Sequence, residues 1–152
     1  MRTLALVLTL CLSSVLSHAA QSGSHVLYIG GTRPDIPAKN SGEIVVSDRT
    51  YFVFTSKHTT VRIPFERINL LEYGQKVNRR VLEAVVISPL FMMSKKREHF
   101  LTVGFQDDDG QQQAMVFQVD KNDIRIALVT LEARTGQAIQ YQDDEARLSG
   151  KG

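Results

Sequence analysis

Cysteine is almost absent from this chain, and tryptophan is absent altogether. The single cysteine, Cys11, lies within the first twenty residues, so the rest of the chain has no thiol. That remaining part can form no disulfide, and it offers no thiolate to a metal or to a substrate. We therefore expect its stability to come from a hydrophobic core alone.

A strong charge of either sign is also lacking. The sequence holds 18 Lys and Arg against 16 Asp and Glu, a formal net charge of +2 at pH 7. Proteins that bind nucleic acid usually carry a concentrated basic excess, which this composition does not provide. We expect no nucleic-acid partner.

Recognisable catalytic motifs are missing as well. After residue 20 the histidines are His25, His58 and His99, and their spacing matches no catalytic triad. There is no G-x-S-x-G serine motif, and the glycine pair Gly30-Gly31 is not followed by the G-K-[ST] of a phosphate loop. We expect a non-enzymatic protein without a cofactor.

One acidic run, "DDDGQQQ" at residues 107–113, invites a calcium interpretation. Calcium loops of the EF-hand type alternate their ligands and close with a glutamate at the twelfth position, a pattern that this run does not follow. The pair Asp109-Gly110 between two apolar runs is instead a hairpin signal. The sequence predicts a turn here and no metal site.

The first twenty residues, "MRTLALVLTLCLSSVLSHAA", have the organisation of an export signal. Arg2 supplies the positive start, Leu4–Leu12 the apolar centre and Ser17–Ala19 a small-x-small cleavage site. The apolar run is shorter than the roughly 20 residues that span a bilayer. We expect cleavage after Ala19 or Ala20, and a periplasmic or secreted protein.

Most of the remaining chain consists of short runs in which apolar and polar residues alternate. Examples are "TYFVFTS", "HFLTVGF" and "QAMVFQV", which are rich in β-branched and aromatic residues. Seven such runs, mostly separated by turn residues, predict a small antiparallel sandwich or barrel. In "TTVRIPF", Pro64 predicts an edge strand or a bulge, because a central strand would miss its N–H.

Near its C-terminal end the chain changes to a helical pattern. The apolar positions share one face of a helix at about 123–135, and they are Ile124, Ala127, Leu128 and Leu131. Asn122 or Asp123 can cap the start, and Gly136 suits a left-handed end. We expect a linker at 21–25, a single domain at 26–141 and a disordered tail at 142–152, with "QAIQYQ" adding a short strand.

The order of seven strands and one C-terminal amphipathic helix resembles the pleckstrin-homology-like superfold, including its GRAM-type and bacterial versions. "VRIPFERINLLEYG" is similar to the stretch in which those domains pass from one sheet to the next. The chain also resembles a group of small, uncharacterised exported bacterial proteins in "YIGGTRPDIP", "IPFERINLLEYGQK", "SKKREHFLTVGF" and "LEARTG". The resemblance implies a mainly β, antiparallel seven-stranded barrel or sandwich capped by the helix, and a bacterial source.

The resemblance carries no activity with it, because a shared fold does not supply a site. Pleckstrin-homology domains that bind phosphoinositides hold basic residues in their first hairpin loop. The corresponding stretch here, "VSDRTYF", contains Arg49 alone, so that headgroup site is not carried over.

A candidate interaction surface lies in "SPLFMMSKKREHF", where apolar residues precede three cations. Its residues are Leu90, Phe91, Met92, Met93, Lys95, Lys96 and Arg97. Apolar side chains rimmed by cations suit an anionic membrane surface or a flexible partner. Alternatively the apolar residues pack into the core and the three cations form a solvated turn that deters edge-to-edge aggregation.

We therefore expect a protein- or peptide-binding or structural module of the cell envelope. Binding would use a sheet edge or the groove beside the C-terminal helix. The alternative is peripheral attachment to an anionic membrane through residues 90–97. An enzyme with an unrecognised site is a distant third reading, and it would need a pocket that gathers His58 or His99 with a carboxylate.

Overall fold

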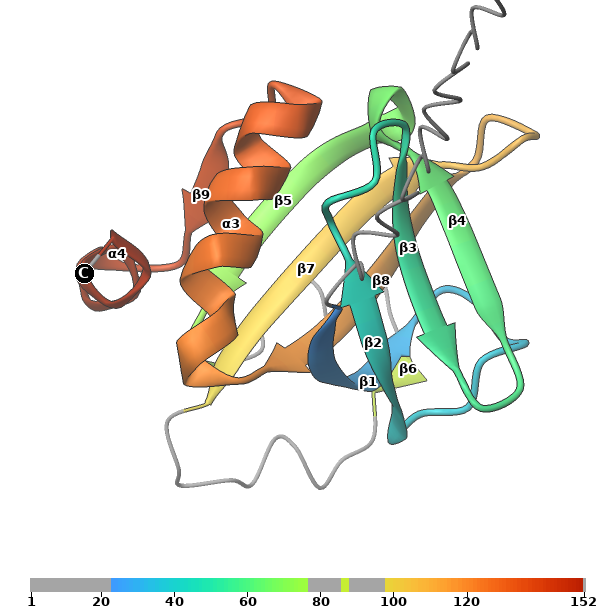
Figure 1. Ribbon diagram of the computed structural model, residues 1–152, viewed down its shortest axis with the longest axis horizontal. Helices are drawn as coiled ribbons and strands as arrows, with labels where there is room; N and C mark the ends of the chain where they lie inside the picture. Colours follow the sequence, from blue (N-terminus) through green and yellow to red (C-terminus); the bar gives the residue numbers. More distant parts are fainter. Residues whose placement is uncertain (1–22, 77–85, 88–97, 152) are drawn as a thin grey trace, which may run out of the picture.

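The computed structural model describes residues 23–76, 86–87 and 98–151. Within these ranges the chain is mainly β, and it forms one curved, mixed sheet with two α-helices beside it (Figure 1). The strands are β1 Ser24–Gly31, β2 Asn40–Val45, β3 Tyr51–Ser56, β4 Thr60–Pro64, β5 Ile68–Gly74, β6 Val86–Ile87, β7 His99–Gln106, β8 Gln112–Val119 and β9 Ile139–Tyr141. The helices are α3 Lys121–Thr135 and α4 Asp144–Lys151, and a short 3₁₀ turn, η1 Phe65–Arg67, joins β4 to β5.

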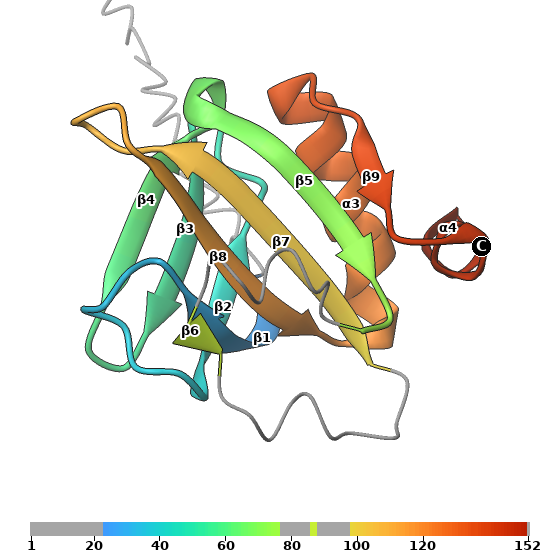
Figure 2. The ribbon, with the colours of Figure 1, turned by 180° about the vertical axis from the view of Figure 1, so that it is seen from behind.

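The strand order across the sheet is β4-β3-β2-β1-β8-β7-β5-β9, with the short β6 paired to β1. Every pairing is antiparallel except that of β5 with β9, which is parallel. The sheet bends so that β1 to β4 face β5, β7 and β8 across the core (Figure 2).

The predicted seven-stranded antiparallel barrel is therefore wrong in its strand count, its strand order and its closure. The described sheet has nine strands and two free ends, at β4 and at β9. Of the run "VLEAVVI" at residues 81–87, the described ranges contain the last two residues, which form β6 and pair with β1. Two residues are too few to show an alternation. Strand β9 lies within "QAIQYQ", so the short strand predicted there is confirmed.

Aromatic side chains from three strands fill the middle of the core. Phe117 of β8 contacts Phe52, Phe54 and Tyr28, with ring centroids 5.2 to 5.8 Å apart. All four side chains are fully buried. Tilted ring pairs at such spacings add to the stabilisation that comes from burying their area.

Helix α3 covers the same core with the predicted apolar stripe. Ile124, Ala127, Leu128 and Leu131 are all buried, which confirms the helical pattern. The helix begins two residues earlier than expected, because Asp120 rather than Asn122 or Asp123 is the N-cap and its carboxylate accepts from the Asn122 N–H at 2.8 Å. Gly136 ends the helix at φ 70°, as predicted.

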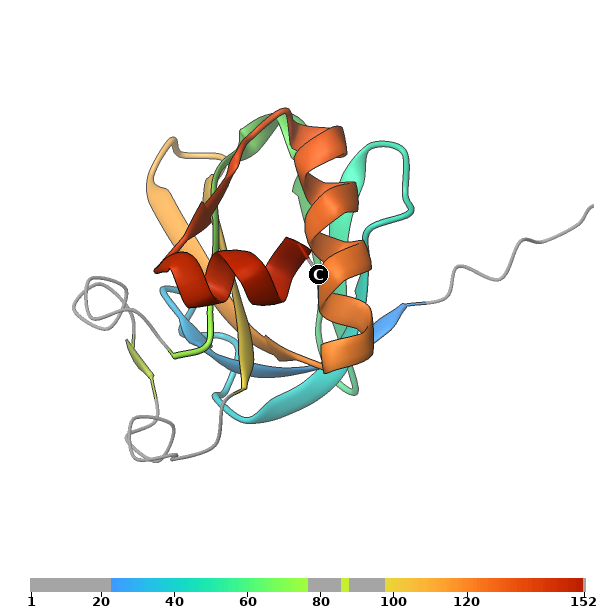
Figure 3. The ribbon, with the colours of Figure 1, turned by 90° about the vertical axis from the view of Figure 1, so that its left-hand side faces the viewer.

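The predicted linker at 21–25 and the predicted tail at 142–152 both contain residues that form regular secondary structure. Strand β1 begins at Ser24, inside the predicted linker. Residues 144–151 form helix α4 instead of a disordered tail, and α4 runs crosswise to α3, beside β5 and β9 (Figure 3). Ala146 is fully buried, and Gly150 lies so close to Tyr141 that a Cβ there would sit 2.7 Å from its ring.

No helix in the described ranges is long and apolar enough to cross a lipid bilayer.

Candidate functional site

The candidate surface formed by residues 90–97 lies outside the residues that the structure describes. Both readings of Leu90, Phe91, Met92, Met93, Lys95, Lys96 and Arg97 therefore stay predictions. The described residues contain two other hollows that merit comparison as sites.

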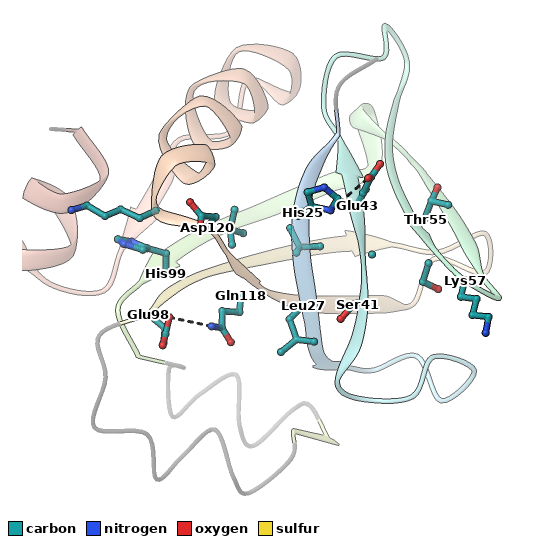
Figure 4. Close-up of a pocket in the computed structure, with 15 residues that line it drawn as sticks. His25, Leu27, Ser41, Glu43, Thr55, Lys57, Glu98, His99, Gln118 and Asp120 are labelled. Carbon is teal, nitrogen blue, oxygen red and sulfur yellow. Dashed lines mark hydrogen bonds and ion pairs between the residues drawn. The ribbon is translucent and has the colours of Figure 1, made fainter. Parts of the chain in front are cut away.

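The larger hollow is an open groove of about 920 Å³ across the outer face of β1, β2, β3 and β8 (Figure 4). His25 of β1 and Glu43 of β2 point toward one another, with Nδ1 and Oε1 3.5 Å apart. Both side chains are exposed, so solvent screens the pair. The sequence predicts a linker at His25, but β1 already begins at Ser24, and His25 therefore lies in this groove.

His99 stands on the other side of the same groove, at the start of β7 as predicted. Its Nδ1 lies 2.6 Å from the Tyr73 hydroxyl, and burial raises the pKa of Tyr73 to about 12. Tyr73 is therefore protonated, and the tautomer of the imidazole decides whether Nδ1 accepts from this hydroxyl or donates to it. Burial, together with the charge of Lys121, lowers the pKa of His99, so the imidazole favours its neutral form.

The carboxylates near His99 already serve local structure. Asp120 caps helix α3, and Glu98 accepts from Gln118 Nε2 at 3.1 Å. In the described ranges the hydroxyl that contacts His99 is a phenol, which at a pKa of about 12 is a poor nucleophile. Among the described residues, no group of three or more His, Cys, Asp or Glu side chains is placed to hold a metal ion. His58, the other histidine considered, is exposed in the turn between β3 and β4.

The second hollow is a cleft of about 360 Å³ between β4 and the loop that joins β7 to β8. We call it the arginine pocket, and the side chains that define it are Arg33, Tyr51, Arg62, Arg67, Asp107 and Asp108. They come from four separate parts of the chain, which the bent sheet brings together.

The walls of the arginine pocket are held by a network around Asp107. Its carboxylate accepts from the Gln113 amide at 2.8 Å and from the backbone N–H of Asp109 and Gln111. These hydrogen bonds hold the pKa of Asp107 below its usual range. Gly110 has φ 76°, so the predicted hairpin turn is confirmed.

The same network ties this loop to the loop between β1 and β2. Thr32 donates through its backbone N–H to Ala114 O at 3.0 Å, and its hydroxyl contacts the Gln113 amide oxygen. Because Gln113 also bonds Asp107, the two loops that flank the pocket are fixed to one another. The pocket is therefore preformed rather than assembled on binding.

Two of the three arginines already hold a carboxylate. Arg33 makes two hydrogen bonds to Asp35, of 3.0 and 2.7 Å, in the two-pronged geometry typical of arginine. Arg67 forms an ion pair with Asp108. Both pairs are exposed at the rim of the pocket, so solvent screens them.

Arg62 differs from the other two. Its guanidinium carbon lies 5.5 Å from the centroid of the Tyr51 ring, in a cation–π arrangement. In the described ranges its guanidinium forms no ion pair. The ring beneath it is well placed, because Asp48 accepts from the backbone N–H of Thr50 and Tyr51 at 2.7 and 2.8 Å. Arg62 is exposed, and its charge adds to the backbone hydrogen bonds from Thr50 and Tyr51 in lowering the pKa of the nearby Asp48.

Arg62 also lies on a free sheet edge. Ser56 N donates to Thr59 O at 2.8 Å, and Phe65 N donates to Thr50 O at 3.0 Å. Because hydrogen-bonded pairs alternate along antiparallel strands, the pairs that involve Thr60, Arg62 and Pro64 are the non-bonded ones. Their backbone groups point away from β3, toward a side on which the described sheet has no further strand.

The position of Pro64 follows from this alternation. Its missing N–H would have faced outward, so it removes no hydrogen bond from the pairing of β3 with β4. The prediction that Pro64 marks an edge strand is confirmed.

The groove beside the C-terminal helix, the other predicted binding place, is already used. Strand β9 pairs with β5 through Leu71 with Ile139 and Tyr73 with Tyr141. A smaller cavity of about 280 Å³ does lie near the end of α3, where Arg49 and Arg134 approach Pro64. It adjoins the arginine pocket on the far side of Tyr51.

Sequence reasoning found the edge but missed the pocket. Alternation placed Arg62 on the polar face of its strand, and Pro64 gave the edge signal. Nothing local indicates that Arg33 and Arg67, more than thirty residues apart in the sequence, meet beside Arg62, because that meeting depends on the bend of the sheet. The chain matches no protein-family model and no curated protein.

Proposed function

We propose that this protein is a non-enzymatic, exported binding module of the cell envelope, which takes an extended peptide segment onto the open edge of β4. The observation that carries the proposal is the outward direction of the backbone groups of Thr60 and Arg62, on the side of β4 that has no described neighbouring strand. An added strand would satisfy these groups, which is the basis of recognition by strand addition.

We also propose a pleckstrin-homology-like arrangement for the domain. In its support, seven strands of five residues or more, β1 to β5, β7 and β8, precede helix α3 in the described chain. The 3₁₀ turn η1 lies between β4 and β5, inside the stretch "VRIPFERINLLEYG" that resembles the crossing between sheets in those domains. Strands β6 and β9 are additions to that arrangement.

Strand addition at β4 predicts weak and selective binding. The edge offers few backbone groups, and each intramolecular or interface hydrogen bond gives only about 1 kcal/mol net. Arg62 and Pro64 also discourage pairing with another sheet, because charge and proline are common protections of free edges. The edge therefore favours a segment whose chemistry complements these residues.

The experiment is a selection of random ten-residue peptides displayed on phage, with the chain lacking residues 1–20 as bait. Hydrogen exchange followed by NMR then reports where a selected peptide binds. We expect the amide protons of Thr60 and Arg62 to exchange rapidly in the free protein and to become protected in the complex.

Two variants of one residue give the matched comparison. Thr60→Pro removes an outward N–H without removing a bond to β3, whereas Thr60→Ala keeps that N–H. We expect Thr60→Pro to weaken peptide binding about fivefold or more and Thr60→Ala to leave it nearly unchanged. Selected peptides that protect amides elsewhere, or a selection that enriches no peptide, would count against the proposal.

A further inference from the structure

We infer that the segment bound at β4 runs antiparallel to it and must carry a free N–H at every second residue of the stretch that pairs. This inference rests on the proposed strand addition and specifies the backbone of the partner. The outward groups of β4 carry it. Thr60 and Arg62 each turn an N–H and a C=O away from β3, whereas Pro64 offers its C=O alone.

The length of β4 favours the antiparallel direction. In an antiparallel pair, a residue exchanges both hydrogen bonds with the residue directly opposite. A guest stretch as long as β4, which has five residues, therefore reaches every outward group of the strand. In a parallel pair the bonds are slanted, so each outward residue bonds the guest residues before and after the one opposite. A parallel guest would have to stay extended past both ends of β4 to make the same bonds.

The chain turns away from the edge at both ends of β4. At one end it turns back into β3, where Ser56 N donates to Thr59 O at 2.8 Å. At the other end η1 follows Pro64 directly, and Phe65 N donates to Thr50 O at 3.0 Å. The chain then continues into β5, which pairs with β7 and β9. A parallel guest would thus project beyond the straight part of the edge, whereas an antiparallel guest fits within it.

The proline decides which guest groups are needed. Antiparallel pairing places the first of the five guest residues opposite Pro64, the third opposite Arg62 and the fifth opposite Thr60. The first residue donates to Pro64 O and receives nothing in return, because proline has no N–H. The N–H groups of the second and fourth residues point away from β4. We therefore expect the partner to exclude proline at the first, third and fifth positions and to accept it at the second and fourth.

The charged side chains near this edge do not select the partner. The guanidinium of Arg62 lies over the Tyr51 ring, on the β3 side of the strand and away from the open edge. The other two arginines of the arginine pocket already pair with carboxylates. Recognition therefore depends on the main chain of the guest, and the partner class is an extended segment defined by its free amides rather than by an acidic or basic side chain.

Spin labels on a selected peptide determine its direction. One version carries a nitroxide just before the first pairing residue and another just after the fifth, and a diamagnetic analogue of each is the control. We expect the first label to weaken the amide NMR signals of Phe65 and Glu66 most, and the second label those of His58 and Thr59. The two ends of β4 lie about 13 Å apart at about 3.3 Å per residue, which separates the two patterns.

N-methylation of the same peptide tests which amides bind. We expect a methyl group on the first, third or fifth pairing N–H to weaken binding about fivefold or more, because each change removes one hydrogen bond to β4. Methylation at the second or fourth residue is the matched control and should leave the affinity nearly unchanged.

The outcomes separate this inference from the strand addition on which it rests. A reversed attenuation pattern, with the Thr60 and Arg62 amides still protected, would overturn the antiparallel direction and leave strand addition intact. Equal losses of affinity at all five methylated positions would overturn the alternation of free amides. If no peptide binds, strand addition and this inference both fail.

Discussion

Arg62 of β4 and His99 of β7 differ in their exposure to solvent. Arg62 is exposed and lies over the face of the Tyr51 ring. His99 is partly buried, and its Nδ1 shares a hydrogen bond with the Tyr73 hydroxyl. Burial and Lys121 lower its pKa, while Glu98 and Asp120 oppose that shift. The folded protein therefore prefers a neutral imidazole at this position.

His99 should make stability depend on pH below about 6.5, the ordinary pKa of histidine. Between that value and the lower pKa of the folded state, the unfolded chain binds more protons, so stability is complete above pH 6.5 and falls as the pH decreases. We expect His99→Gln to flatten the decline of the melting temperature between about pH 7.5 and pH 5.5. His58→Gln, at an exposed turn, should keep the wild-type slope. A wild-type slope in His99→Gln would contradict the assignment.

At the scale of elements, local patterns predicted the pieces that carry their own signal. The stripe from Ile124 to Leu131 and the glycine at 136 specified α3, and Pro64 specified the edge character of β4. Helix α4 had no such signal, because its eight residues are mostly polar and it is too short to be stable by itself. It packs onto the rest of the protein through two small residues: Ala146 is buried, and Gly150 allows a close approach to Tyr73 and Tyr141. That complementarity is tertiary, so no window of sequence contains it.

Placing a charge at Ala146 should release α4 from the sheet without unfolding the domain. Ala146 is fully buried, so Ala146→Asp would bury an unpaired carboxylate unless the helix detaches. Leu148→Asp is the matched control, because Leu148 is 69% exposed on the same helix. We expect trypsin to cleave after Arg147 much faster in Ala146→Asp than in the wild type or in Leu148→Asp. Equal cleavage rates in all three would show that α4 does not depend on this contact.

At the scale of the whole molecule, the sequence indicated a mainly β fold but not the number of paired strands or whether the sheet closes. Alternating runs are enough to predict a mainly β chain, because each strand must bury one face. How many strands pair, and whether the sheet closes, depends on contacts between distant segments such as β5 with β9 and β1 with β8. The arginine pocket belongs to the same class of feature, since its cations come from separate segments.

Export remains a prediction from residues 1–20, and it can be tested on the whole protein. Expression of the full chain in a bacterial host should give a periplasmic or secreted product whose intact mass corresponds to removal of residues 1–19 or 1–20. Replacing Leu8 and Leu10 with arginine should retain the full-length chain in the cytoplasm, because it interrupts the apolar centre of the signal. A full-length wild-type chain in the cytoplasm would refute export.

The two ends of the described sheet differ in their suitability for strand addition, and this difference predicts how many peptide segments one copy binds. Strand β9 is three residues long and runs directly toward α4, whereas β4 is five residues long and faces outward beside a cation. A subunit receptive on both flanks could join copies head to tail into an open filament. If strand addition takes place at β4 alone, each copy of the protein binds one peptide segment. We therefore expect one-to-one complexes rather than filaments.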